Sequence, residues 1–466
     1  YFGRSILKEN RRYEKVIKLI KNEITKLLHK KSIYIVLIIT AMFMVLVSFI
    51  NSKDASYSYD PSVYYDPSDP DPVAKEMNEY YKKYKSSDWQ AYKLDDFYLV
   101  ASSYYNEKNN EEYKLEYEKY KEAFKNNDWK YFVNTDLAKG KNDLEILKTG
   151  LLDKTLSKKE VRNLKASIFQ KETEIEMLEY RLKENVAYGS DYLNQAISSI
   201  NNASYGKYLY ENVDSKNSDY QQNVKTYYES KYILDTKEDT NNIQDLRSSL
   251  MHFFDNYIFL ILVFGVMIAG SIVSEEYNKG TIKSLLITPY KRNTILLSKF
   301  ITVLIMLLLF VIVAYFMDFI IGGCFLGFQS ITNHVVTYNF STNTLEIMGL
   351  FKYILIKTLA ILPEIILLIT LAFAVSTIIG NTAFAIVITF AGFIASSIIN
   401  MFAVYYKIEI LKYFVTTNWN FNEYLFGATS QYGTSFTHAV IVCIIYFLIM
   451  VITSFIVFKR KNIKNV

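Results

Sequence analysis

The feature that most constrains the fold is the uneven distribution of charge along the 466-residue chain. Charged side chains concentrate in residues 1–32 and 51–255, whereas the remainder contains long runs almost free of charge. A helix needs about 20 mostly apolar residues to cross a bilayer. Six runs meet this requirement: 33–50, 257–274, 300–321, 353–378, 382–404 and 438–458. The pattern predicts an all-α polytopic membrane protein with six transmembrane helices, and it excludes a soluble enzyme or a disordered chain.

Basic residues in the short segments predict the orientation of these helices. The segment before residue 33 carries ten Lys or Arg, the loop 275–299 carries five, and the tail after residue 458 carries four. The loop 323–351 carries none. Because basic loops stay on the cytoplasmic side, we expect both termini in the cytoplasm and residues 51–255 outside the cell. The abundance of Tyr, Lys, Asn, Ile and Phe is typical of an A/T-rich bacterial genome, so the expected location is a bacterial plasma membrane.

Residues 51–255 are expected to form a mainly helical extracellular domain. Four of the six prolines lie in residues 60–72, which indicates a stiff linker leaving the membrane. Apolar residues in 161–182 follow a/d spacing and predict a helix with a partner helix at residues 144–151. The block also holds 25 of the 40 tyrosines. They could form a binding surface, but we favour the interpretation that most of them pack small helices.

An amphipathic helix is predicted before the first transmembrane run, over residues 14–31 within the cytoplasmic segment 1–32. Its apolar face consists of Val16, Ile17, Leu19, Ile20, Ile24, Leu27 and Leu28, and its lysines are Lys15, Lys18, Lys21, Lys26 and Lys30. Such a helix can lie in the membrane interface with its lysines at anionic headgroups. The alternative is a cytosolic helix that packs on a protein partner.

The loop 275–299 between the second and third runs is the most informative segment. Glu275 and Glu276 would end the second transmembrane helix, where the helix dipole disfavours an anion by about 0.3–1 kcal/mol. The residues that follow have the character of a short capped amphipathic helix: Gly280, Thr281, Ile282, Leu285, Leu286 and Pro289. A short helix of this kind suits docking into a groove of a soluble partner. The alternative is an ordinary juxtamembrane loop.

Three charged residues fall within or near the third and fourth runs: Asp318, Lys357 and Glu364. A charge at the bilayer centre costs about 2.5–3.5 kcal/mol on insertion scales, so such residues usually pair or line water. Glu364 is the deepest and follows Pro363, which removes a helix hydrogen bond. We consider equally a functional role and a purely structural role for Glu364.

No catalytic or metal-binding cluster is expected from the sequence. Cys324 and Cys443 lie far apart in apolar runs, and the four histidines are scattered. The chain has no G-x-x-x-x-G-K-S/T phosphate-binding loop. We therefore expect neither catalytic residues nor a cofactor in this chain, and no nucleic-acid partner.

The loop contains an acidic pair, Gly280-Thr281, Leu285-Leu286, Pro289, Arg292 and an apolar run ending in Lys299. This series resembles the signature of ABC transporter permeases of the type-2 exporter superfamily. Residues 371–385 are similar to the Ser/Asn-containing turn between that family's fourth and fifth transmembrane helices. The resemblance covers the N-terminal helix and all six runs, about half of the chain. The large insertion between the first two runs resembles exporters of sodium, peptide antibiotics and lipid-like drugs.

This resemblance implies a membrane subunit that exports an amphipathic, peptide-like or drug-like compound. Two permeases, identical or paralogous, would form the pathway, and separate cytoplasmic ATPase subunits would bind ATP and Mg. The ATPase contact would involve Glu275, Glu276, Gly280, Thr281, Ile282, Leu285, Leu286, Pro289 and Arg292, and residues 404–437 would form outer re-entrant helices. Candidates for the transport pathway or the dimer seam would be Asp318, Lys357, Pro363 and Glu364, with Glu364 the main one. A membrane receptor or scaffold whose extracellular domain binds a partner is the main alternative. An ion-driven carrier is a less favoured alternative, because such carriers usually contain an internal repeat of transmembrane helices and this sequence shows none.

Overall fold

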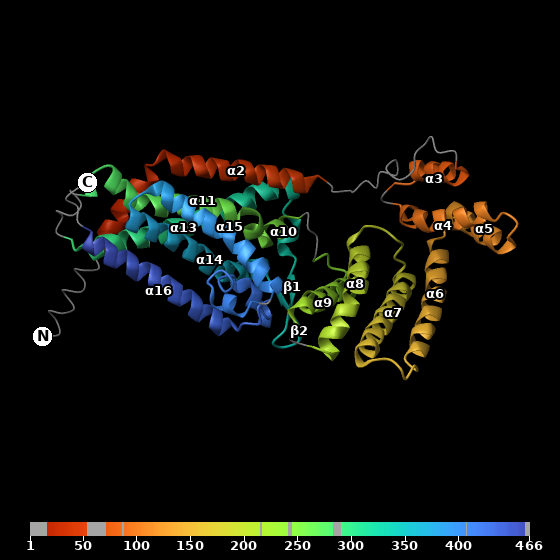
Figure 1. Cartoon of the computed structure of the whole chain (residues 1–466). Coiled ribbons are helices and arrows are strands. Elements are labelled where there is room, and N and C mark those ends of the chain that lie inside the picture. The colour runs from red at the N-terminus through yellow and green to blue at the C-terminus, as the bar shows by residue number, and fades with distance from the viewer. Residues whose placement is uncertain are drawn as a thin grey trace. The chain divides into compact units, whose positions relative to one another are not determined.

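The computed structural model of the chain describes residues 16–53, 71–85, 88–214, 217–240, 245–282, 290–406 and 408–461. The chain divides into two compact units, each described by itself below (Figure 1). The span unit comprises Tyr1–Ser52, Ile243–Val335 and Met348–Val466, and the inserted unit comprises Lys53–Asn242 and Val336–Ile347. The inserted unit thus ends before residue 255, the predicted boundary, and takes in a second, separate stretch of chain.

The span unit consists mainly of long apolar helices, preceded by a short helix at residues 16–28. The long helices are α2 (Lys31–Ser52), α11 (Phe253–Asn278), α13 (Arg292–Leu326), α14 (Leu350–Ile379), α15 (Thr382–Tyr406) and α16 (Phe436–Arg460). Within the described residues, these six helices are long and apolar enough to cross a membrane. The chain is therefore a mainly helical membrane protein. Because α13 begins at Arg292, the predicted loop 275–299 is helical at both of its ends.

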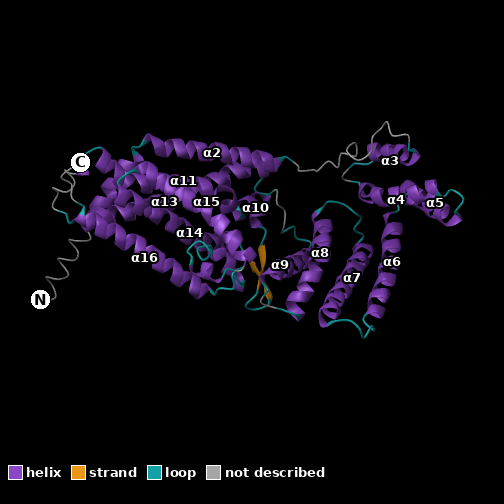
Figure 2. Cartoon of the chain, viewed as in Figure 1, coloured by secondary structure: helices purple, strands orange, loops and turns teal. Residues whose placement is uncertain are grey.

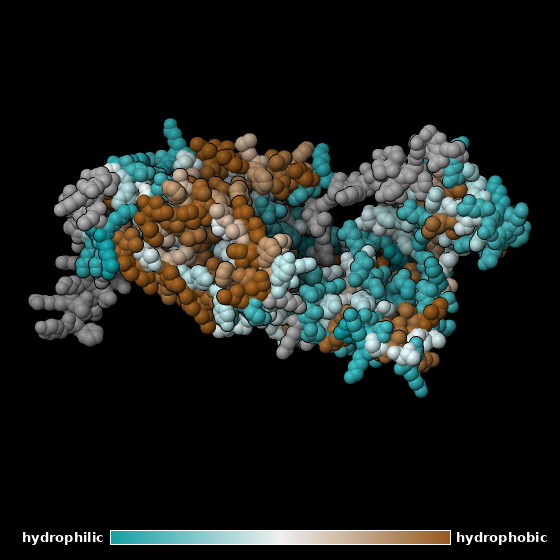
Figure 3. All heavy atoms as spheres, viewed as in Figure 1, coloured by the Kyte–Doolittle hydropathy of each residue, from teal (hydrophilic) through white to brown (hydrophobic). Residues whose placement is uncertain are grey.

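Helix α11 lies at the centre of the span unit and contacts α2, α13, α14 and α15. Its glycines allow close approach, since a Cβ at Gly265 would lie 2.3 Å from the Ile369 side chain. By contrast, α2, α15 and α16 leave large apolar side chains exposed, and Met42 on α2 is 68% exposed. In Figure 3 apolar residues cover much of the visible face of this unit. Such a surface is stable only against lipid or another apolar surface.

A tight turn joins α14 to α15, as the Gly380-Asn381 pair predicts. Gly380 takes a left-handed conformation with φ of +75°, which ends α14, and the side chain of Asn381 accepts a hydrogen bond from the backbone of Ala383 at 2.8 Å. The end of α14 is also fastened to α11, because the Ser376 hydroxyl donates to the Gly270 carbonyl at 2.7 Å.

Shorter elements complete the span unit. They are α10 (Leu246–Met251), η3 (Gln329–Thr332), η4 (Glu409–Tyr413) and η5 (Phe421–Gly427). Helix α10 packs on α13 and α14, and η5 packs on α14 and α16. Between α15 and α16, in the segment 404–437 that was predicted to be re-entrant, the described residues form the short 3-10 helices η4 and η5.

The inserted unit is a series of helices in which consecutive members pack on one another (Figure 2). They are α3 (Pro72–Lys83), η2 (Trp89–Lys93), α4 (Leu94–Asn106), α5 (Glu111–Lys125), α6 (Trp129–Gly150), α7 (Lys158–Glu184), α8 (Tyr192–Asn212) and α9 (Ser218–Thr236). The predicted pairing of the a/d helix with its partner is confirmed, since α6 and α7 pack together. Many tyrosines belong to aromatic clusters: Tyr117, for example, is buried and stacks on Tyr104 at 4.6 Å between ring centroids.

A two-stranded hairpin, β1 (Val335–Asn339) and β2 (Thr344–Met348), was not predicted from the sequence. Its central residues lie in the chain between α13 and α14 but belong to the inserted unit. The Tyr338 ring stacks on Tyr228 of α9 at 4.9 Å, and the Tyr338 backbone N–H donates to the Glu229 carboxylate at 3.3 Å. The loop between the third and fourth apolar helices is therefore built into the inserted unit.

The stability of the inserted unit is expected to fall as the pH rises, because burial disfavours the ionised form of Glu229. Burial raises the pKa of Glu229 from 4.5 to about 7, although Lys225 and the hydrogen bonds from Thr337 and Tyr338 lower it. The folded form thus binds more protons than the unfolded form between about pH 4.5 and 7. Stability from this group, about 3 kcal/mol in order of magnitude, is present at low pH and lost as the pH rises through 7.

Glu229→Gln should therefore flatten the loss of thermal stability between pH 5 and pH 8 and raise the unfolding temperature at pH 8. The amide keeps an oxygen that can accept from Tyr338 but carries no charge. Glu179→Gln, at a side chain 56% exposed in the same unit, is the control and should leave the pH profile unchanged. If the wild type and Glu229→Gln lose thermal stability equally between pH 5 and pH 8, ionisation of Glu229 is not the cause of the loss.

Candidate functional site

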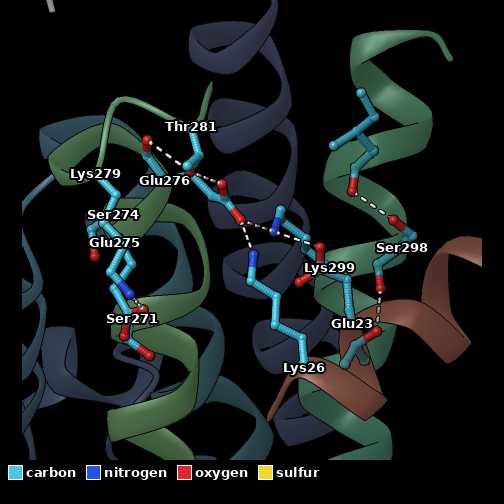
Figure 4. Close-up of polar contacts among 12 residues, drawn as sticks. Glu23, Lys26, Ser271, Ser274, Glu275, Glu276, Lys279, Thr281, Ser298 and Lys299 are labelled. Atoms are coloured by element: carbon cyan, nitrogen blue, oxygen red, sulfur yellow. Dashed lines mark hydrogen bonds and ion pairs between the residues drawn. The ribbon is translucent and has the colours of Figure 1, made fainter. Parts of the chain in front are cut away.

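A buried ion-pair cluster connects three helices at one end of the span unit (Figure 4). Lys299, near the start of α13, is 1% exposed. Its ammonium lies 2.9 Å from the Glu23 carboxylate on the helix at residues 16–28 and 3.4 Å from the Glu276 carboxylate at the end of α11. Glu23 and Glu276 are themselves buried. One cation therefore joins segments that are far apart in the sequence.

The acidic pair at the end of α11 is surrounded by further cationic and hydroxyl groups. Glu276 also forms an ion pair with Lys26 and accepts a hydrogen bond from the Thr281 hydroxyl. Glu275 pairs with Lys30 at 2.6 Å and with Lys279 at 3.2 Å. These cations offset the unfavourable interaction of two carboxylates with the C-terminal end of the helix dipole. The acids thus act at least in part by fastening α11 to its neighbours.

The chain leaves α11 through Gly280, whose φ of +69° favours glycine. Ile282 follows and is fully buried in the apolar cluster of the span unit. The Thr281 hydroxyl, the predicted cap of the short helix, donates a hydrogen bond to the Glu276 carboxylate. The other predicted members of the amphipathic stripe, Leu285 and Leu286, and the predicted terminator Pro289 lie outside the described residues.

Arg292, where α13 begins, is bound to the end of α16, and through Lys461 this contact extends to the end of α14. Its guanidinium donates to the backbone carbonyls of Lys459 and Lys461 at 3.2 and 3.1 Å, at the C-terminal end of α16. Lys461 in turn donates to the Ile378 carbonyl at the end of α14 at 3.1 Å, and its ammonium lies 4.4 Å from the centre of the Tyr277 ring. Cations at helix C-terminal carbonyls are favourable. We call the cluster around Lys299, with Lys30, Glu275 and this Arg292 contact, the coupling network.

Sequence reasoning missed four members of the coupling network: Glu23, Lys26, Lys30 and Lys299. The sequence placed Lys26 and Lys30 on the polar face of a helix at the membrane interface or against a protein partner; in the structure they form ion pairs with Glu276 and Glu275. Burial by itself lowers the pKa of Lys26. The hydrogen bond to Glu276 and the charges of the neighbouring carboxylates raise it by more, so the pKa of Lys26 lies above its usual value. Two adjacent acids in the last turn of a helix were a signal that nearby cations were needed.

The predicted intramembrane charges are held separately from the coupling network. Asp318 on α13 is fully buried and accepts hydrogen bonds from Tyr257 at 3.0 Å and from Ser249 at 3.2 Å. Lys357 on α14 donates to the Met251 carbonyl at 2.8 Å and pairs with Asp255 at 3.1 Å. These contacts give Asp318 and Lys357 structural partners.

Glu364 also lies on α14, directly after Pro363, and is buried. It forms no ion pair with Lys357. Among the described residues no group of three or more His, Cys, Asp or Glu is arranged to hold a metal ion.

The long apolar helices and their internal ion pairs define the class of this chain as a multi-span helical membrane protein. It belongs to the DUF2705 family, described as a protein of unknown function, whose family model matches residues 215–464, more than half of the chain. The chain is also similar to the uncharacterized protein YhcI of Bacillus subtilis (strain 168), with 27% identity over 222 residues that cover 45% of this chain and 67% of that protein. No solved structure matches the chain significantly.

Replacing Lys299 should be far more harmful than replacing a neighbouring exposed lysine. Lys299→Met leaves two buried carboxylates short of a cation, which typically costs about 3–5 kcal/mol. Lys279→Met removes an ion pair whose lysine is 66% exposed, at a cost of about 0–1 kcal/mol. Thermal unfolding of the purified protein in detergent measures the difference.

Adding Glu276→Gln to Lys299→Met should recover part of the lost stability, because one of the stranded charges is removed. Equal unfolding temperatures for Lys299→Met and Lys279→Met would show that the ion pairs of Lys299 do not stabilise the protein more than an exposed ion pair does.

Proposed function

We propose that this chain is the membrane subunit of an ATP-driven exporter in a bacterial plasma membrane. It moves an amphipathic, peptide-like or drug-like compound out of the cell. Two such subunits, identical or paralogous, form the pathway, and separate cytoplasmic ATPases bind ATP and Mg. In the proposed topology the chain crosses the membrane six times, with both termini in the cytoplasm and the inserted unit outside, as the basic residues of the short loops favour.

The observation that carries this proposal is the coupling network on both sides of residues 283–289. The chain enters this segment from the end of α11 and leaves it near the start of α13. Both ends are joined by Lys299 to each other and to the helix at residues 16–28. A soluble motor that moves this segment would therefore move α11, α13 and the N-terminal helix together. An ordinary loop has no need of such a buried linkage.

The contacts of Arg292 extend the linkage to further helices. Through the carbonyls of Lys459 and Lys461, Arg292 is joined to the end of α16, and Lys461 reaches the end of α14. A displacement at the proposed docking segment can in this way reach most of the apolar helices. This distribution suits a subunit whose helices must move relative to one another during transport.

The exposed apolar faces are consistent with a membrane-embedded pair of subunits. Side chains such as Met42 on α2 and Met401 on α15 are more than half exposed. Lipid covers such faces, and a second copy or paralogue covers part of them in the proposed dimer.

The proposal predicts that the chain copurifies from its native membrane with a stoichiometric ATPase. Leu285→Asp/Leu286→Asp should release this ATPase, because charges replace the apolar stripe expected to enter its groove. Leu115→Asp/Leu152→Asp, at positions 57% and 77% exposed in the inserted unit, is the matched control and should retain it. Copurification and ATP hydrolysis by the complex are the measurements.

A preparation gentle enough to preserve other membrane complexes, yet free of any ATPase, would contradict the proposal. It would instead favour a receptor or scaffold whose inserted unit binds a partner.

A further inference from the structure

A short motif occurs twice in the inserted unit, and its two copies pack on each other. Residues 80–89 and 120–129 share an aromatic residue at the first position, a second aromatic residue four positions later, a lysine directly after it and a closing Asp-Trp pair. The ring of Phe124, from the second copy, lies 5.8 Å from that of Tyr80 and 5.9 Å from that of Tyr84, both from the first copy, between centroids. The repeated segments therefore meet through their aromatic residues.

The aromatic residues of the two copies differ in burial. Tyr120 and Phe124 of the second copy are 8% and 2% exposed. Tyr80 and Tyr84, at the same positions of the first copy, are only partly buried. The planes of these two tyrosine rings are parallel to within 5°, with 6.2 Å between their centroids. The first copy thus leaves two parallel aromatic rings partly uncovered, where the second copy buries its own.

A cavity of about 570 Å³ lies beside these two rings, between α3 and the C-terminal half of α5. Sites for small molecules typically have volumes of about 300–1,000 Å³. Tyr80 and Tyr84 line the cavity from α3, and charged side chains line it from α5. Among the described residues that line it, none is an aliphatic residue such as Leu, Ile or Val. The cavity therefore offers two aromatic rings in otherwise polar surroundings.

The polar lining combines hydrogen-bond donors with hydrogen-bond acceptors. The charged lining residues of α5 lie three or four positions apart, on one face of the helix: Glu118, Lys121, Glu122 and Lys125. Such spacing allows ion pairs along a helix. In the described part of the chain no ion pair forms within this set, and Lys121 pairs instead with Glu76 of α3 at 3.3 Å. Carboxylate acceptors and ammonium donors therefore both remain along this wall of the cavity.

The chemistry of the lining favours one class of ligand. A compact anion such as phosphate would meet the carboxylates as well as the lysines, and like charges side by side are unfavourable. A peptide takes much of its specificity from pockets for its side chains, and this lining provides no aliphatic pocket. A sugar hydroxyl can both donate to a carboxylate and accept from an ammonium. The weakly positive C–H groups of a sugar ring are also attracted to the negative face of an aromatic ring.

We infer that the cavity between α3 and α5 is a binding site for a saccharide. In this site Tyr80 and Tyr84 contact the C–H groups of a sugar ring. Glu118 and Glu122 accept hydrogen bonds from its hydroxyls, and Lys125 donates to them. This site does not depend on the exporter function proposed above.

The test uses the purified full-length protein in a detergent that has no sugar headgroup. Glucose, maltotriose, N-acetylglucosamine and its trimer are titrated separately by isothermal titration calorimetry, and so is the tripeptide lysyl-tyrosyl-glutamate. We expect saturable binding of at least one saccharide. Tighter binding of a trisaccharide than of its monosaccharide identifies a glycan chain as the source of the ligand, and equal binding identifies a free sugar.

Tyr84→Ala and Glu122→Ala should each weaken saccharide binding by about tenfold, through the loss of an aromatic contact or of a hydrogen bond to a charged group. Tyr92→Ala and Glu116→Ala are the matched controls and should leave binding unchanged. Tyr92 of η2 is 43% exposed, Glu116 is exposed on α5, and neither lines the cavity. If Tyr84→Ala does not fold, Glu122→Ala decides, because the side chain of Glu122 is exposed.

Three results would overturn the site. The first is the absence of saturable binding of all four saccharides. The second is equal affinity of Glu122→Ala and Glu116→Ala for the saccharide that binds. The third is saturable binding of the tripeptide alone, which would show that the cavity takes a peptide.

Discussion

The buried ammonium of Lys299 is the interaction on which one end of the span unit depends. It lies between Glu23 and Glu276, at 2.9 and 3.4 Å, in an environment where an unpaired charge is costly. Without it, the buried carboxylates of Glu23 and Glu276 would lose the cation that they share. This one cation joins the N-terminal helix, the end of α11 and the start of α13. Apolar side chains of the same segments, among them Leu27, Tyr277 and Leu296, are buried in one cluster beside it.

This arrangement gives physical meaning to the proposed docking segment. If the two helices that flank the segment were not bound to each other, a displacement of the segment would stay local. A segment bounded by a buried ion-pair cluster passes the displacement to every helix that the cluster joins. At the inserted unit, the hairpin of β1 and β2 ties the loop between α13 and α14 to α9 through Tyr338 and Glu229.

Periodicity and charge predicted much of the fold. The six apolar helices, the Gly380-Asn381 turn and the pairing of α6 with α7 depend on local patterns that the sequence displays directly. The hairpin was missed because each strand has only 5 residues and β1 is buried at consecutive positions, so it does not alternate between buried and exposed side chains. Lys26 and Lys299 were missed because their partners lie 250 and 23 residues away, and no local pattern reports such pairing. The amphipathic pattern indicated a polar face, but it could not distinguish lipid headgroups from buried carboxylates.

The most direct test of the central claim is a photo-crosslink from the proposed docking segment in native membranes. A photoreactive residue placed at Ser284 should capture a soluble subunit that carries a phosphate-binding loop, identified by mass spectrometry. The same residue placed at Leu152 of the inserted unit should not capture it. Crosslinking from Ser284 to lipid alone, or to proteins without a nucleotide-binding site, would contradict the account.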